Sequence, residues 1–329
     1  MPGYAKGREH VNAAGVRGPE LAPREPGAFR ILAMGGSTTW GHKVADDETW
    51  PAQLQARLRA AGLPRAEVIN GGVSGWGLQQ VLIALRTRLL DQLQPDLVLI
   101  DCGWNWPVLE GNPEVVRFRR MAATSEHKDW LHRSAFVRWL DRKLEPLGAG
   151  GGGGGEGRGG GGTATRAGVT ATDAIFTGRS GIAKAMEASF PALYKEAAEL
   201  SQQRGVPIVI VRYGALAQLP APADPALAAR YEELLRTERT AQVAGEDLNR
   251  AARDEYASAL AIIDAAAPAA GLRVLDVATR MFQDAGGEGA GARWLDLFRD
   301  RMHLTPVGNA AVAEALAALL QEQGLLPAP

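Results

Sequence analysis

Short apolar runs of strand-forming residues alternate with longer segments of helical periodicity, and this alternation constrains the fold more than any other feature of the sequence. The strand-like runs are residues 29–34, 67–70, 97–101, 207–212 and 273–277. The helix-like segments are residues 51–61, 78–93, 182–204, 225–266 and 306–323. Strands and helices in this order are typical of a parallel sheet with helices on both faces. The sequence therefore predicts an α/β protein built in three layers.

One segment interrupts the pattern. Residues 148–162 read GAGGGGGGEGRGGGG and contain almost nothing that can be buried, and glycine loses the most conformational entropy on ordering. We interpret them as a flexible, solvated insertion, and not as a dinucleotide-binding loop, because no strand precedes them and no helix follows. We therefore expect an N-terminal extension, residues 1–28, and one α/β domain, residues 29–329, which contains an insertion at residues 107–180.

Charge and cysteine content exclude several classes of protein. The chain has 36 basic and 37 acidic residues, so its charge gives no reason to expect a nucleic-acid partner. The single cysteine, Cys102, excludes an intramolecular disulfide and a zinc site made of several thiolates.

No apolar run reaches the ~18 to 20 residues of a membrane span, and the first residues lack the apolar core of a signal peptide. We expect a cytoplasmic protein by default, or an extracytoplasmic one if an upstream segment is missing.

In a parallel sheet, ligand chemistry gathers at the carboxyl ends of the strands. After the first predicted strand, residues 35–41 read GGSTTWG, and the glycines leave the hydroxyl of Ser37 standing at the strand end. Taken alone, this segment is explained better as a Ser/Thr-rich turn that caps a helix. A phosphate loop would need Lys and Ser/Thr after the Gly36-to-Gly41 spacing, where His42 and Lys43 stand. The G-x-S-x-G elbow of α/β-hydrolases is also missing.

Three further motifs follow in chain order. Residues 70–77, NGGVSGWG, form a loop in which backbone N–H groups can point outward. Asn105 follows the third predicted strand, so its side-chain amide donor stands just beyond a strand end, as Ser37 does after the first strand. In Asp300-Arg-Met-His303, the carboxylate can bond Nδ1 of the imidazole and leave Nε2 free as a base. Taken singly, the asparagine and the Asp-x-x-His motif each have an ordinary explanation as turns.

A strand-end serine, a glycine loop, a strand-end asparagine and a late Asp-x-x-His in this order make the sequence resemble the SGNH (GDSL-type) hydrolase family, from about Gly15 to Leu320. The resemblance implies a flavodoxin-like α/β/α fold with a five-stranded parallel sheet. It also implies serine-dependent cleavage of an ester through an acyl-enzyme, with no cofactor and no metal.

Carried over by position, the resemblance makes Ser37 the nucleophile, His303 the general base and Asp300 the group that orients His303. It implies an oxyanion hole formed by the N–H groups of Ser37 and Gly75 and by the side-chain amide of Asn105. The expected substrate is a small ester, a lipid or an O-acetylated carbohydrate. The same residues would also support transfer of the acyl group to another alcohol, because water and an alcohol attack the same intermediate.

Two features depart from the family pattern. The first motif commonly reads Gly-Asp-Ser, whereas Gly36 stands in the place of the aspartate here. Residues other than this aspartate must therefore hold the turn that carries Ser37. Trp104 and Trp106 flank Asn105, and we expect these rings to shape or narrow the acyl pocket. These departures leave open a non-catalytic glycan-binding or scaffold module. A nucleotide-binding protein that uses residues 36–41 is a second, weaker alternative.

The remaining histidines give no competing site. His127 and His132 are five residues apart, a spacing that does not place both on one face of a helix to hold a metal. His10 and His42 have no partner pattern, and we interpret them as solvated residues.

Residues 128–147 have the pattern of a basic amphipathic helix within the insertion. We favour a helix that packs on the protein's own core with its basic face in water. The alternative is a lid over the active site, or a patch that contacts a lipidic substrate at a membrane surface.

Overall fold

The computed structural model describes residues 5–101, 181–213, 215–216, 222–235, 247–285 and 293–327. These residues build a five-stranded sheet in the order β4-β3-β5-β6-β7, with every neighbouring pair parallel. The strands are β3 (Phe29–Gly35), β4 (Ala66–Asn70), β5 (Leu97–Asp101), β6 (Ile208–Arg212) and β7 (Arg273–Asp276). This order is the flavodoxin-like one, and it confirms the predicted fold class.

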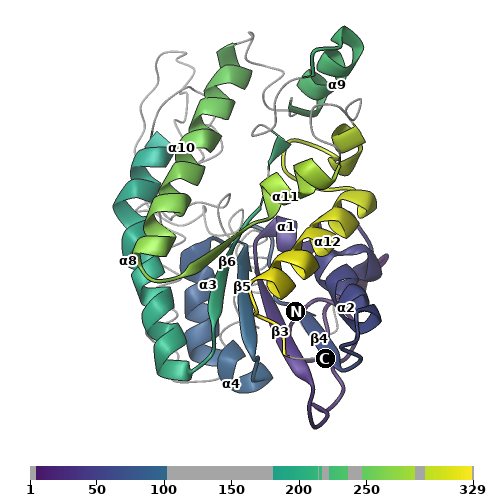
Figure 1. Cartoon of the computed structure of the whole chain (residues 1–329), viewed down its shortest axis with the longest axis vertical. Helices are drawn as coiled ribbons and strands as arrows, with labels where there is room; N and C mark the ends of the chain where they lie inside the picture. The colour runs from purple at the N-terminus through teal and green to yellow at the C-terminus, as the bar shows by residue number, and fades with distance from the viewer. Residues whose placement is uncertain are drawn as a thin grey trace, which may run out of the picture.

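Helices cover both faces of the sheet (Figure 1). One layer holds α2 (Trp50–Ala60), α11 (Val277–Asp284) and α12 (Pro306–Glu322), which contact one another in series. The other layer holds α3 (Leu78–Ala84), α8 (Gly181–Arg204) and α10 (Asp247–Ala269). After α3 the helix continues through a π-helical stretch, Leu85–Leu89, into α4 (Leu90–Leu93). The three predicted layers are therefore present.

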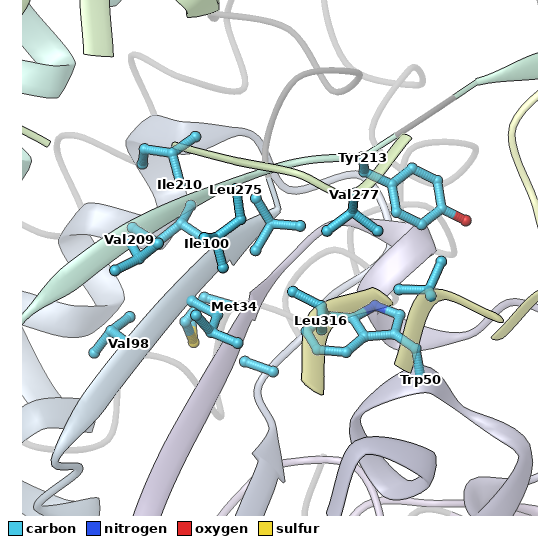
Figure 2. Close-up of a cluster of buried hydrophobic side chains, with 14 of the residues drawn as sticks. Met34, Trp50, Val98, Ile100, Val209, Ile210, Tyr213, Leu275, Val277 and Leu316 are labelled. Atoms are coloured by element: carbon cyan, nitrogen blue, oxygen red, sulfur yellow. The ribbon is translucent and has the colours of Figure 1, made fainter. Parts of the chain in front are cut away.

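The core lies between the sheet and these helices, and its side chains come from every strand. Figure 2 shows part of it, where Met34, Val98, Ile100, Val209, Ile210 and Leu275 lie together on the sheet. Trp50 and Leu316 bring α2 and α12 to the same core, and both side chains are fully buried. The backbone N–H of Trp50 donates to Oδ1 of Asn309 (2.9 Å), which fixes the start of α2 against α12.

The structure departs from the predicted elements at two places. The helix expected over 225–266 is two helices, α9 (Pro225–Leu235) and α10, and residues 236–246 between them are outside the described part. The fifth strand, expected to run to Val277, ends at Asp276. The Asp276 carboxylate accepts the N–H of Thr279 (3.0 Å), so this residue caps α11 instead of extending the strand.

The N-terminal segment lies against the body of the domain. A short hairpin pairs β1 (Ala5–Lys6) with β2 (Glu9–His10). Further along, Val11 and Val16 are buried, and the N–H of Arg17 donates to the carbonyl of Asn70 (2.9 Å) at the end of β4. This segment therefore meets the sheet at the carboxyl end of its edge strand.

The predicted insertion at 107–180, the amphipathic segment 128–147 and the glycine-rich segment 148–162 are all outside the described residues, as are Asn105, Trp104 and Trp106. In the part of the chain that is described, every helix is too short or too polar to cross a bilayer.

Candidate active site

The turn that carries Ser37 leaves the carboxyl end of β3 and enters α1 (Ser37–Trp40), a single helical turn. The turn closes through Trp40 N–H to the Gly36 carbonyl (2.9 Å) and Gly41 N–H to the Ser37 carbonyl (3.0 Å). Gly41 ends it with φ of +80°, a left-handed conformation that favours glycine. A side chain at Gly35 would overlap Thr39 and the backbone of the neighbouring strand, so a residue without Cβ is required where the turn leaves the sheet.

The structure brings Ser37, His303 and Asp300 together from opposite ends of the chain. Oγ of Ser37 lies 2.9 Å from Nε2 of His303, and Nδ1 of His303 lies 2.8 Å from Oδ2 of Asp300. Since Nδ1 faces a carboxylate, the favoured tautomer carries its proton there, and Nε2 is left to accept the proton of Ser37. The arrangement is a hydroxyl, an imidazole and a carboxylate in one hydrogen-bonded line.

A tight loop before α12 holds the imidazole in place. The N–H of Arg299 donates to the carbonyl of His303 (2.8 Å), and the N–H of Thr305 donates to the carbonyl of Leu297 (2.9 Å). The Thr305 hydroxyl also accepts the N–H of Gly308 (3.1 Å) and so caps α12. A side chain at Gly308 would overlap the Leu297 backbone, so the loop and the helix pack in contact.

The Asp300 carboxyl stays ionised through its contacts. Burial alone would raise its pKa, but the hydrogen bond and the charge of His303, with the N–H groups of Met302 and His303 on Oδ1, hold the pKa at about 2. An anion at this position stabilises a positive charge on the imidazole. The group is thus suited to assist proton transfer from Ser37.

The glycine loop after β4 lies directly against the Ser37 turn. The N–H of Gly71 donates to the carbonyl of Ala33 (2.8 Å), and the N–H of Val73 donates to that of Gly35 (3.0 Å). A side chain at Gly72 would overlap the backbone of α1, so the loop depends on glycine there. Gly75, the predicted oxyanion-hole donor, is exposed at φ of +83°. Asn105, the other predicted donor after a strand, lies outside the described residues.

The interpretation of His42 as an ordinary solvated residue is wrong. Its ring lies 5.0 Å from that of His303, centroid to centroid, and the backbone N–H of His42 donates to the carbonyl of Ser37 (3.2 Å). Burial lowers the pKa of His42, and the neighbouring His303 and Lys43 lower it further. No spacing motif in the sequence marks this residue, because the contact depends on a loop from the far end of the chain.

Asp101 is a second buried group that sequence reasoning missed. It is the last residue of β5, is 2% exposed, and accepts the hydroxyl protons of Thr38 (2.6 Å) and Thr39 (3.1 Å) on Oδ2. Burial raises its pKa to about 6, although the two hydroxyl bonds favour the ionised form. Its position as the last residue of a predicted strand is the signal in the sequence that could mark it.

The phosphate-loop alternative does not fit the backbone. A phosphate loop surrounds its ligand before the helix begins, whereas α1 begins at Ser37, inside the Gly36-to-Gly41 spacing. Across the described ranges, no group of three or more His, Cys, Asp or Glu side chains is placed to hold a metal ion.

Comparison with known proteins finds one local sequence similarity and several structural resemblances. A stretch of 96 residues is 36% identical to an arylesterase from Vibrio mimicus, and it makes up 29% of this chain and 47% of that protein. The chain thus matches about half the length of this relative. Among solved structures, it resembles a lipase/acylhydrolase from Enterococcus faecalis, with a TM-score of 0.45, 15% identity and coverage of 90% of this chain and 96% of the other. It also resembles the acetyl xylan esterase AlAXEase, with a TM-score of 0.43, 13% identity and coverage of 88% and 98%.

The sequence matches the model of the GDSL-like lipase/acylhydrolase family over residues 33–311, a span that begins in β3 and ends in α12. This span includes Ser37, the glycine loop and the Asp300–His303 pair. The protein therefore belongs to the GDSL-like lipase/acylhydrolase family.

Proposed function

We propose that this protein hydrolyses carboxylic esters, with Ser37 as the nucleophile, His303 as the general base and Asp300 as the group that orients His303. The observation that carries the proposal is the hydrogen-bonded line from Oγ of Ser37 through the imidazole to the carboxylate. Family membership supports the same chemistry.

In the proposed reaction, Oγ of Ser37 attacks the ester carbonyl carbon while its proton moves to Nε2 of His303. The tetrahedral intermediate collapses when the carbon–oxygen bond to the alcohol breaks and Nε2 returns the proton to the leaving oxygen. Water then attacks the acyl-enzyme and gives a proton to His303, and that proton returns to Oγ as the carboxylic acid leaves. Asp300 remains ionised throughout and stabilises the imidazolium, in accord with the low pKa of its carboxyl.

We further propose that the N–H groups of Ser37 and Gly75 and the side-chain amide of Asn105 stabilise the oxyanion. Ser37 is the first residue of α1, so its N–H has no partner within that helix, and no bond from it is seen among the described residues. The φ of +83° at Gly75 turns the backbone in a way that a larger residue would resist. Loss of one such donor typically lowers kcat about 10²- to 10³-fold.

For the substrate, we propose a small ester, in line with the local identity to an arylesterase. An O-acetylated carbohydrate and a longer lipid ester are the variants to be compared with it. A series of p-nitrophenyl esters from acetate to palmitate, assayed beside acetylated oligosaccharides, would separate them. A short-chain optimum supports the small-ester proposal, and activity that peaks at palmitate contradicts it. Repetition with an added alcohol would show whether the acyl group is transferred instead of hydrolysed.

The decisive test of the mechanism is covalent labelling with an organophosphonate probe. We expect one label on Ser37 in the wild-type protein, and none in Ser37→Ala or His303→Ala at the same protein concentration. Ser201→Ala provides a folded control, because the Ser201 hydroxyl donates to the Val206 carbonyl (2.8 Å) just before β6, at the amino end of the parallel strands and thus opposite to Ser37. An unlabelled wild-type protein with no esterase activity would contradict the proposal and favour a non-catalytic binding module.

A further inference from the structure

The turn that carries Ser37 has little support of its own. Helix α1 is four residues long, and Gly36 at its N-cap has no side chain to bond the free N–H groups. An isolated single turn of helix is unstable, because its few hydrogen bonds do not offset the entropy lost on nucleation. The orientation of Ser37 must therefore be fixed by contacts from outside the turn.

Asp101 provides such contacts from the neighbouring strand. The two residues after Ser37, Thr38 and Thr39, both donate their hydroxyl protons to Oδ2 of Asp101, at 2.6 and 3.1 Å. All three side chains are buried, at 7% exposure or less. Successive helical residues are rotated by about 100°, so two side chains tied down to the sheet leave the preceding residue on the opposite side of the turn. That residue is Ser37.

We propose that Asp101 is a positioning residue, which anchors the Ser37 turn through Thr38 and Thr39 and thereby keeps Oγ of Ser37 aligned with Nε2 of His303. This inference rests on the proposed ester hydrolysis. It also explains how the turn is held when Gly36 replaces the aspartate common in the first motif of the family.

The surroundings of Asp101 argue against a purely structural role. Within the described part of the chain no Lys, Arg or His side chain pairs with it, and its Oδ1 is buried without a hydrogen-bond partner. A buried carboxylate with an unpaired oxygen and no cation destabilises a fold. Groups of this kind are found where function, and not stability, requires them.

The test compares kcat and KM of Asp101→Ala, Asp101→Asn and Thr38→Val on p-nitrophenyl acetate, with rates expressed per Ser37 labelled by the phosphonate. We expect Asp101→Ala to lower kcat about 10- to 100-fold and to leave KM within about twofold, because misplacement of a nucleophile affects the transition state more than binding. Asp101→Asn keeps an acceptor oxygen for the two hydroxyls, so it should retain more of the kcat than Asp101→Ala.

A double-mutant cycle shows whether Asp101 acts through the threonine hydroxyls. If it does, Asp101→Ala combined with Thr38→Val loses no more kcat than Asp101→Ala alone. Independent, multiplying losses would overturn the inference. Thr38→Ser keeps the hydroxyl and should keep kcat. Ser201→Ala, which removes a hydroxyl bond at the amino end of the sheet, should lower stability and leave kcat per labelled site unchanged.

Failure of this inference is distinct from failure of the proposed function. If wild-type protein is labelled and active and Asp101→Ala keeps the wild-type kcat, only the role of Asp101 is overturned. If wild-type protein is neither labelled nor active, the proposed hydrolysis is overturned, and the role of Asp101 falls with it. Should Asp101→Ala not fold, Thr38→Val and Thr38→Ser decide the question, since they leave the carboxylate in place.

Discussion

Two carboxyl groups beside the Ser37 turn have pKa values shifted in opposite directions. Asp300 is held at about 2 by His303 and two backbone N–H groups, and Asp101 is raised to about 6 by burial. The two shifts have opposite consequences for stability. Ionised Asp300 stabilises the fold above about pH 4, and that contribution is lost as the pH falls toward 2. Asp101 is easier to ionise in the unfolded chain, so the fold loses stability as the pH rises from about 4 to 6.

Asp101→Asn is therefore expected to gain stability over the wild type as the pH rises. Its free energy of unfolding relative to wild type should increase between pH 4 and 6 by up to about 3 kcal/mol and stay constant above, because only the wild type must ionise a buried group. Tyr213 does not titrate over this range, because burial raises its pKa and the charges of Asp101 and Asp300 raise it further. Urea denaturation at pH 4, 6 and 8 measures the difference, and a difference that does not vary with pH contradicts the expectation.

We expect the neutral state of His42 to matter for the reaction, because a charge at this position would oppose the imidazolium of His303. Burial and the nearby His303 and Lys43 lower its pKa, so it is neutral near pH 7. His42→Arg would place a permanent cation against His303 and oppose formation of the imidazolium. We expect kcat/KM to fall about tenfold and the acid limb of its pH profile to move to lower pH. His42→Gln, uncharged and similar in size, is the control, and equal profiles for Arg and Gln would exclude a charge effect.

At the level of elements, the N-terminal segment holds the end of α1 and the loop that follows it through hydrogen bonds from Arg17. The Arg17 side chain is 1% exposed and donates to the carbonyls of Trp40, Gly41 (2.6 Å) and Val44 (2.5 Å), while its Nε pairs with Asp46 (2.8 Å). One side chain from outside the sheet thus satisfies three carbonyls at the end of α1 and in the loop that follows it.

Arg17→Met should therefore destabilise the protein strongly. Removal of one partner of a buried ion pair typically lowers the free energy of unfolding by about 3 to 5 kcal/mol, and three carbonyls would also lose their donor. Arg8→Met is the matched control, because Arg8 pairs with Asp47 and Glu48 at the surface, where such pairs contribute about 0 to 1 kcal/mol. Urea denaturation of both variants tests this, and similar losses would show that Arg17 is no more important than a surface arginine.

The elements differ in how far the sequence could predict them. Strands β3 to β6 are largely apolar and mostly buried, although β3 contains Arg30 and β4 contains Glu67, so the sequence predicts their positions to within a residue or two. Helix α11 was missed because Val277 extends the apolar pattern of β7, and the capping bond of Asp276 that ends the strand is visible only in three dimensions.

Ser37, Asp300 and His303 were predicted from motifs, whereas Asp101, Arg17 and His42 act through contacts between distant segments and carry no motif.

At the scale of the whole molecule, the candidate site depends on the complete sheet. Strand β3 lies between β4 and β5, so the chain crosses to opposite sides of β3 on its way through the sheet, and the Ser37 turn stands at this switch point. His303 arrives from the last loop before α12, which packs on α2. The two groups meet only when both ends of the chain have folded onto the same core.

The glycine-rich segment 148–162 lies between β5 and α8, and we propose that the domain folds and acts without its specific sequence. The β5–β6 pairing is in register from Val98 with Ile208 to Ile100 with Ile210, and a parallel crossover needs only about a dozen residues, which α8 alone exceeds. Deletion of the segment should change the free energy of unfolding by less than about 0.6 kcal/mol, because closure entropy varies slowly with loop length. It should also leave kcat/KM on p-nitrophenyl acetate within about twofold.

A replacement of equal length with alternating Gly and Ser is the control. If the deletion inactivates the protein and the replacement does not, the length of the segment matters. If both inactivate it, the segment makes contacts that the domain requires, which contradicts the expectation.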